Sequence, residues 1–171
     1  MKNWRLKKTL SRRVETRPIE DADVKYAWAA YKLGKFTVIP DGMDAPQFKS
    51  AFEQLVLIAF PATWVVSAET KKGFMPIGMV FGSFAPLNTH LNIGGVAWFP
   101  WASKRNILEG DVAFFNMLRK QPFQWIGYAR PEHKAAYEVC CMHGIMRRVG
   151  TMHFADGPLA VFEGKKQYCR S

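Results

Sequence analysis

The sequence predicts one α+β domain, with strands and helices interspersed along the chain. Residues 63–69 and 74–84 are rich in β-branched and aromatic side chains and flank a short Lys-Lys-Gly turn, which is typical of an antiparallel hairpin. From residue 91 to residue 144 the pattern becomes strand, helix, strand, helix. The 171 residues, 49% of them hydrophobic, suffice for one core of ordinary size. We therefore expect one domain over residues 14–164, between a basic arm (1–13) and a short basic tail (165–171).

The N-terminal part of this domain predicts a strand followed by a helix. Residues 14–17 have the composition of a short strand. The acidic segment 19–23 suits the first turn of a helix, because carboxylates are favourable near the positive end of the helix dipole. This helix is expected to end at Gly34.

A second helix is predicted from its N-terminal signals. Asp44 is the expected N-cap, Pro46 lies in the first turn and Gln47 occupies the capping-box position. The apolar residues that follow recur at helical spacing and should share one face: Phe48, Phe52, Leu55 and Ala59. Pro61 should end the helix, since continuation through it is costly.

The C-terminal half predicts alternating strands and helices after the hairpin. We expect strands over residues 91–99, 123–129 and 159–163, and helices over residues 109–120 and 131–144. Gly144 is a suitable helix stop. The whole order is strand, two helices, three strands, helix, strand, helix, strand.

The charge is strongly positive and unevenly distributed. The net charge is +10, and the arm supplies six of these charges without any acidic residue: Lys2, Arg5, Lys7, Lys8, Arg12 and Arg13. Such an arm can contact DNA, another polyanion or an acidic protein surface by long-range attraction. The alternative interpretation is a solvated terminus that keeps the protein soluble.

The short apolar runs and the cysteine content indicate a protein that is not secreted. No apolar run approaches the roughly 20 residues that span a bilayer, and no signal-peptide pattern is present. We expect a cytoplasmic or virion-associated protein without a membrane span. Cys140, Cys141 and Cys169 form neither an even disulfide framework nor a zinc-binding pattern. Cys140, Cys141 and His143 are neighbours on one helix and cannot all point at one ion, so we expect no metal site.

In the order of these elements, the chain resembles the GNAT N-acetyltransferase superfamily over residues 14–164. Three local features carry the resemblance: the Arg-x₅-Asp turn of Arg17 and Asp23, Gly78 after the hairpin turn, and Ala136 eight residues before Gly144. The resemblance implies a central mixed, mostly antiparallel sheet flanked by helices. It also implies acetyl-CoA as cofactor, with its pyrophosphate held by backbone N–H groups of a Gln/Arg-x-x-Gly-x-Gly/Ala loop.

The expected cofactor loop departs from the family pattern. Asn106 and Leu108 stand at the two glycine positions, and a leucine side chain is bulky where the pyrophosphate should press. The side chains of Lys104 and Arg105 could attract the pyrophosphate by their charge, but a point charge does not replace several backbone N–H groups that all face it. If the protein is an enzyme, the resemblance places the cofactor against residues in the strand 91–99 and directly after it: Val96, Trp98, Ser103, Lys104, Arg105 and Asn106. Otherwise residues 103–109 are an ordinary loop and N-cap region.

The sequence also departs from the family pattern at the positions of the catalytic acid and base. Cys140 stands where the family pattern has tyrosine, and Tyr137 lies one turn earlier on the same helix. His133 stands at the family's asparagine position. For a base, the nearest candidates are Glu69 and His90. The catalytic set, if there is one, is therefore Tyr137, Cys140 and Glu69, while a cysteine on an apolar helix face is more often plain core.

Two functional hypotheses follow. The first, which these three departures favour, is a GNAT-fold protein that has lost transferase chemistry and needs no cofactor. Such a protein would act as a binding or structural component beside other protein subunits, and the chain resembles the small basic GNAT-like virion or assembly proteins of tailed bacteriophages. The second is an active acetyl-CoA-dependent N-acetyltransferase with an atypical loop. Trp101, in the loop after Pro100, is the expected protein-contact residue.

Overall fold

The computed structural model describes residues 14–85, 90–121, 123–129, 134–155 and 157–164. Within them, seven strands form one sheet in the order β1-β2-β3-β4-β5-β7-β6. The strands are β1 (Val14–Pro18), β2 (Ala62–Thr70), β3 (Gly73–Phe84), β4 (His90–Trp98), β5 (Gln124–Ala129), β6 (Met146–Phe154) and β7 (Gly157–Gly164). All neighbouring strands are antiparallel except β4 and β5, which are parallel. The predicted α+β class and mixed, mostly antiparallel sheet are confirmed.

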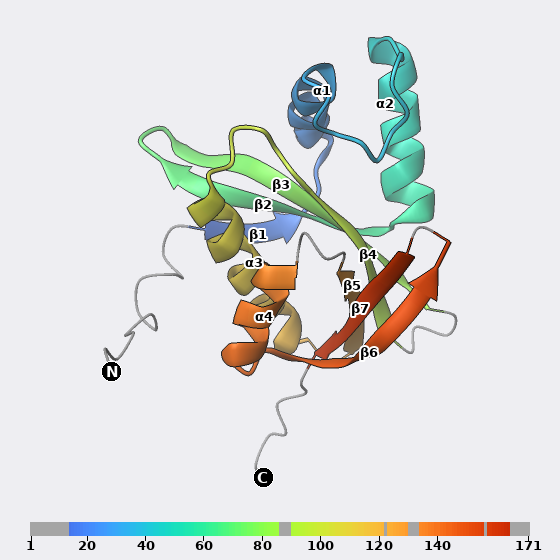
Figure 1. Ribbon diagram of the computed structural model, residues 1–171. Coiled ribbons are helices and arrows are strands. Elements are labelled where there is room, and N and C mark those ends of the chain that lie inside the picture. The colour runs from blue at the N-terminus through green and yellow to red at the C-terminus, as the bar shows by residue number, and fades with distance from the viewer. Residues whose placement is uncertain (1–13, 86–89, 122, 130–133, 156, 165–171) are drawn as a thin grey trace.

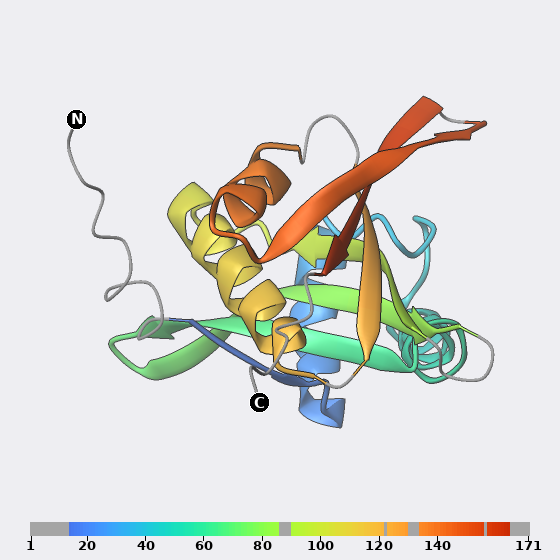
Figure 2. The same cartoon turned by 90° about the horizontal axis from the view of Figure 1, so that it is seen from below.

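The helices form one layer on each side of the sheet (Figures 1 and 2). They are α1 (Val24–Lys32), α2 (Ala45–Gln54), α3 (Lys104–Arg119) and α4 (Lys134–Met142), with a short 3-10 turn η3 (Asp21–Asp23) and a π turn η4 (Leu55–Ala59). Helices α1 and α2 pack on one face with Val65, Met79 and Phe81, whereas Val66 and Val80 point into the core on the other face, beneath α3 and α4. This alternation follows from the two-residue period of a strand.

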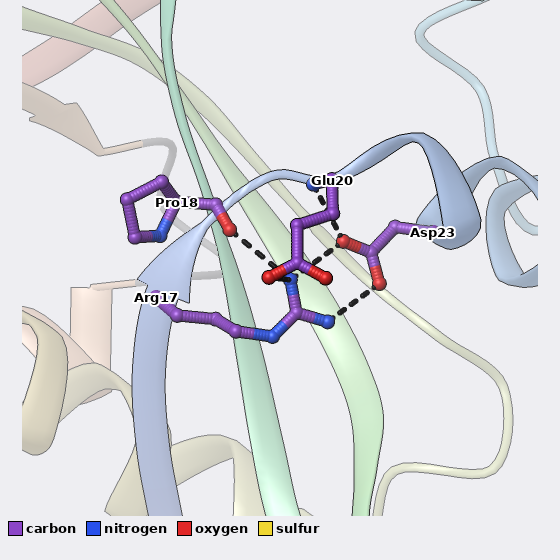
Figure 3. A network of polar contacts seen from close by, with 4 residues as sticks. All are labelled: Arg17, Pro18, Glu20 and Asp23. Carbon is purple, nitrogen blue, oxygen red and sulfur yellow. Dashed lines mark hydrogen bonds and ion pairs between the residues drawn. The ribbon is translucent and has the colours of Figure 1, made fainter.

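The turn from β1 into η3 is closed by the predicted arginine and aspartate (Figure 3). Both Arg17 guanidinium Nη atoms donate to the Asp23 carboxylate at 2.8 Å, and Glu20 N–H donates to the same carboxylate at 2.9 Å. Arg17 Nη1 also donates to Pro18 O at 3.1 Å. The Arg-x₅-Asp spacing therefore sets the angle between the first strand and the first helix.

Helix α2 begins as predicted but ends differently. The Asp44 carboxylate accepts from Gln47 N–H at 2.9 Å, and the Gln47 side chain accepts from Asp44 N–H at 3.0 Å. The expectation that Ala59 shares one face with Phe48 and Phe52 is wrong, because the last turn is a π turn in which Phe60 N–H bonds to Leu55 O at 2.8 Å. The wider turn exposes Ala59 and brings the Phe60 ring to 5.8 Å from that of Phe81.

Two further expectations about the elements are corrected. Helix α3 starts at Lys104 and not near residue 109, because Ser103 caps it: the Ser103 hydroxyl accepts from Asn106 N–H at 3.1 Å. Strand β6 was not predicted at all. It pairs with β7 from Met146 to Phe154, and its residues 147–153 are exposed, so it lacks the apolar alternation that marks a strand. None of the described helices has the length and apolar character needed to cross a membrane.

Candidate functional site

Strands β4 and β5 run side by side and then separate. Their parallel pairing ends at Ile93 and Gly127, whereas β4 continues to Trp98 and β5 to Ala129. Beyond Ile93, β4 has only β3 as a strand partner among the described residues. On its other edge, the backbone of this part of β4 has no strand partner among the described residues, which is the arrangement that a ligand hydrogen-bonding like a strand would need. We call residues 94–98 and 128–129 the fork.

Aromatic rings cover the apex of the fork from the two faces of the sheet. Gly94 is a bulge in β4, since Gly95 pairs with Phe81 while Ile93 pairs with Gly82. The Phe60 ring lies so close to Gly94 that a Cβ there would collide with it, which requires glycine. On the α3 and α4 side, Tyr137 Cε1 and its hydroxyl lie 3.5 and 3.7 Å from the position of a Cβ on Gly127.

Beside Tyr137 lies a group of buried titratable side chains from α3 and α4. Asp111 on α3 is 5% exposed, Tyr137 on α4 is 5% exposed, and Cys140 on α4 is fully buried. Burial raises the pKa of Asp111 to about 7. Burial and the nearby Asp111 charge raise the pKa values of Tyr137 and Cys140, so both remain protonated at neutral pH.

The N-terminus of α3 follows directly after β4 and the loop at residues 99–103. The N–H groups of Lys104 and Arg105 precede the first helical bond, Ile107 N–H to Ser103 O at 2.9 Å, and so have no partner inside the helix. The first turn contains no acidic residue. Its two cations are unfavourable beside the positive helix end unless an anion is present. Arg105 Nε, however, already donates to the buried Glu109 carboxylate at 2.7 Å.

Two tryptophans of this region are engaged in packing. Trp98 lies between β3 and α3, where a Cβ on Gly78 or Gly110 would collide with its ring. Trp101 donates its indole N–H to Pro76 O at 2.7 Å, and its ring contacts that of Phe99 in a tilted arrangement with a centroid distance of 5.0 Å. Trp101 is half-buried, so its polar atom and much of its ring already hold the loop against β3.

The structure brings together some of the predicted site residues and separates others. Tyr137 and Cys140 lie near the fork, and Val96 and Trp98 belong to it. Glu69 does not join them: it is exposed and pairs with Phe74 at the far end of the hairpin, whereas β4 ends opposite Gly78. His90 lies at the other end of β4. His133 and the six cations of the basic arm lie outside the described residues.

Asp111 is the site residue that the sequence alone did not reveal. An aspartate within a helical pattern normally faces solvent. The available signal is its helical spacing from apolar residues, since Phe114, Phe115 and Leu118 follow it by three, four and seven positions and are all buried with it. Within the described ranges, no three His, Cys, Asp or Glu side chains gather closely enough to hold a metal ion.

The shape of the chain is similar to that of known acetyltransferases, although its sequence is not. No protein-family model and no curated protein sequence matches it. The ribosomal-protein-S18-alanine N-acetyltransferase of Escherichia coli superposes with a TM-score of 0.59 at 10% identity, covering 92% of this chain and 97% of that one. An acetyltransferase of the GNAT family from Bacillus cereus gives 0.59 at 11% identity, with 90% and 98% covered.

The aminoglycoside acetyltransferase AAC(6')-Ib, crystallised with coenzyme A and kanamycin, gives a TM-score of 0.62 at 16% identity. The superposition covers 92% of this chain and 99% of that one. At these identities the likeness establishes architecture and not activity. The forked sheet between two helical layers is the fold of the GNAT acetyltransferases.

Proposed function

We propose that this protein binds an acyl-coenzyme A at the fork and transfers the acyl group to an amine. The observation that carries the proposal is the separation of β4 from β5 after Ile93 and Gly127, which leaves the edge of β4 open next to the N-terminus of α3. Support comes from AAC(6')-Ib, which has this fold and was crystallised with coenzyme A.

The residues at the fork suit two parts of such a cofactor, its diphosphate and its amide-containing arm. Its diphosphate suits the N–H groups of Lys104 and Arg105 and the exposed Lys104 ammonium. The glycines missing at positions 106 and 108 matter less than the sequence suggests, because both positions lie inside α3, and Leu108 is 37% exposed. The amide-containing arm suits the open edge of β4 around Val96.

The chemistry divides between the cofactor and the chain. When bound, the acyl thioester supplies an activated acyl carbon. Tyr137 contributes a hydroxyl that stays protonated and lies at Gly127, where the strands separate. Cys140 stays a thiol in the core, so it is not the nucleophile of a covalent mechanism.

A second candidate is a GNAT-fold binding protein without transferase activity. It is favoured by side chains that are already engaged: the Ser103 hydroxyl caps α3, Arg105 pairs with Glu109, and Trp98 packs against α3. In this case the protein would be a subunit of a larger assembly, such as a tailed-phage virion. The arm of residues 1–13 would then contact DNA or a neighbouring subunit.

Titration calorimetry with acetyl-CoA separates the two candidates. We expect micromolar affinity for the wild type and a loss of about tenfold in K104A, since one charge-assisted contact to phosphate contributes roughly 1.5 kcal/mol. The exposed Lys49 on α2 provides the matched control, and K49A should bind like the wild type. Absence of binding by the wild type would reject the transferase and favour the binding protein. Removal of residues 2–13 should then weaken DNA binding in a salt-dependent manner.

A further inference from the structure

The turn between β2 and β3 carries two adjacent lysines at one corner of the sheet. Lys71 and Lys72 are exposed, and neither forms a salt bridge with another described residue. The Thr70 hydroxyl donates to Gly73 O at 2.6 Å and accepts from Lys72 N–H at 3.2 Å. Gly73 has a φ of 106°, a conformation that favours glycine. The two ammonium groups are therefore presented by a turn of defined shape.

The basic arm joins the sheet at this same corner. Val14, the first residue of β1, pairs with Ala68, which lies three residues before Lys71. Because β1 is antiparallel to β2, its N-terminal end lies toward the turn (Figures 1 and 2). The spacing of strands and of residues along them gives a separation on the order of 10 Å between Val14 and the turn. A 13-residue chain spans up to about 40 Å, so the cations of the arm can reach a ligand that is bound at the turn.

Positive charge predominates at this corner. We call Val14 and residues 69–74 the hairpin corner. Its one carboxylate is that of the exposed Glu69, against two lysines, and the charge of Glu15, the next residue of β1, acts on Arg17. The arm that is attached at Val14 adds six cations and no carboxylate. This concentration of cations is complementary to a polyanion.

Phe74 adds an aromatic ring to the charge. Its side chain is 48% exposed and lies opposite Glu69 in the hairpin, and it has no ring contact within the described part of the chain. Lysines beside an exposed aromatic ring are the combination that suits a single-stranded nucleic acid, because the cations contact phosphates while a base stacks on the ring. A duplex keeps its base faces covered, and an acidic protein surface offers no bases. The ring therefore favours a single strand as the partner.

We propose that the hairpin corner and the basic arm bind single-stranded nucleic acid. Lys71 and Lys72 contact phosphates of one short segment, Phe74 stacks on a base of that segment, and the arm neutralises neighbouring phosphates. The binding is additional to acyl transfer at the fork, since it uses none of the residues assigned to the cofactor.

Fluorescence anisotropy with a labelled oligothymidylate tests the proposal on the full-length chain. The oligonucleotide has about 20 nucleotides, longer than the roughly 4 to 16 that one small domain covers. We expect K71Q/K72Q to weaken binding and to reduce the slope of log K against log salt by about 1.4, since each phosphate contact on a single strand contributes about 0.7. The matched control is K32Q/K35Q, which removes two exposed lysines at and just after the end of α1 and should keep the wild-type slope.

The stacking contact is tested by a separate pair of variants. F74L keeps an apolar side chain but removes the ring, so the affinity should fall at least about fivefold. F84L makes the same change at the opposite end of β3, where Phe84 is 39% exposed, and should bind like the wild type. A duplex of the same length should bind more weakly than the single strand and should not respond to F74L. An oligouridylate of equal length shows whether RNA or DNA is the tighter ligand.

The proposal is overturned if the wild type does not bind the oligothymidylate, if the two double variants have equal salt slopes, or if F74L binds like F84L. It is also overturned if poly-L-glutamate displaces the labelled strand as well as unlabelled oligothymidylate does at equal charge, which would assign the corner to an acidic protein. Calorimetry with acetyl-CoA should give the same result for K71Q/K72Q as for the wild type. Failure of nucleic-acid binding and failure of cofactor binding are therefore distinguishable.

Discussion

Arg17 and Asp23 join the first strand to the first helix by two parallel hydrogen bonds, each 2.8 Å long. The Asp23 side chain is 1% exposed and that of Arg17 is 31% exposed. The bond to Asp23 is the main cause of the raised pKa of Arg17. Since the carboxylate also accepts from Glu20 N–H, it organises the start of η3 as well as pairing with the strand.

Replacement of Arg17 by methionine should therefore destabilise the protein markedly. R17M leaves the Asp23 carboxylate buried without its cation, which costs about 3 kcal/mol. Urea unfolding measures this loss. The control is K49M, which removes an exposed pair with Glu53 of 3.8 Å and should cost less than about 0.5 kcal/mol. Equal, small effects of the two substitutions would contradict a structural role for Arg17.

The order of elements was predictable because most of them carry strong local signals. Asp44 and Gln47 form the expected capping box, and Arg17 and Asp23 pair across the expected turn. The forked sheet follows from the strand, helix, strand succession over residues 91–129, since a helical crossover makes β4 and β5 parallel. The fold class therefore required no knowledge of distant contacts.

The strand β6, the start of α3 and the burial of Asp111 were not predicted, because they depend on contacts that the sequence pattern does not show. Strand β6 is held by its backbone pairing with β7, and exposed side chains such as Arg148 and Thr151 carry no strand pattern. The first turn of α3 is polar, so its apolar periodicity starts only at Val112 although Ser103 caps it earlier. Asp111 is buried and lies near Tyr137 and Cys140 of α4, a proximity between two helices that sequence spacing does not reveal.

Gly110 allows α3 to approach the sheet, and G110A should destabilise the protein. A Cβ at this position would lie 2.8 Å from Trp98 Cη2 and 3.0 Å from Val66 Cγ1. Overpacking of this kind costs about 1 to 3 kcal/mol, which exceeds the gain of about 1 kcal/mol in helix propensity. Thermal unfolding by circular dichroism measures the balance.

The matched control for G110A is G150A, because a Cβ on Gly150 has no heavy atom within 4 Å. This substitution should change the free energy of unfolding by less than about 0.5 kcal/mol. A G110A protein more stable than the wild type would show that the contact between α3 and Trp98 can widen at no cost.

Cys140 should be protected from alkylation in the folded protein. It is fully buried, and burial together with Asp111 raises its pKa, so little thiolate is present and none is accessible. In a variant with Cys141 and Cys169 changed to serine, N-ethylmaleimide should react at least about a hundredfold more slowly with the native than with the urea-unfolded protein. Rapid labelling of the native variant would show that Cys140 is accessible from the fork.

The stability of the protein should depend on pH through Asp111. Its pKa is 3.8 in the unfolded chain and about 7 in the folded protein, so the folded state holds the proton more tightly. The stabilisation by this proton is complete below about pH 4 and is lost as the pH rises to about 7. The shift corresponds to about 4 kcal/mol. The asparagine variant D111N cannot ionise, so relative to the wild type it should gain stability progressively over this interval and no further above it.

Urea unfolding of the wild type and D111N between pH 4 and 8 measures this difference directly. D41N, which removes an exposed carboxylate, should run parallel to the wild type over the whole range. If the difference between D111N and the wild type stays constant with pH, the Asp111 carboxylate is compensated in the folded protein.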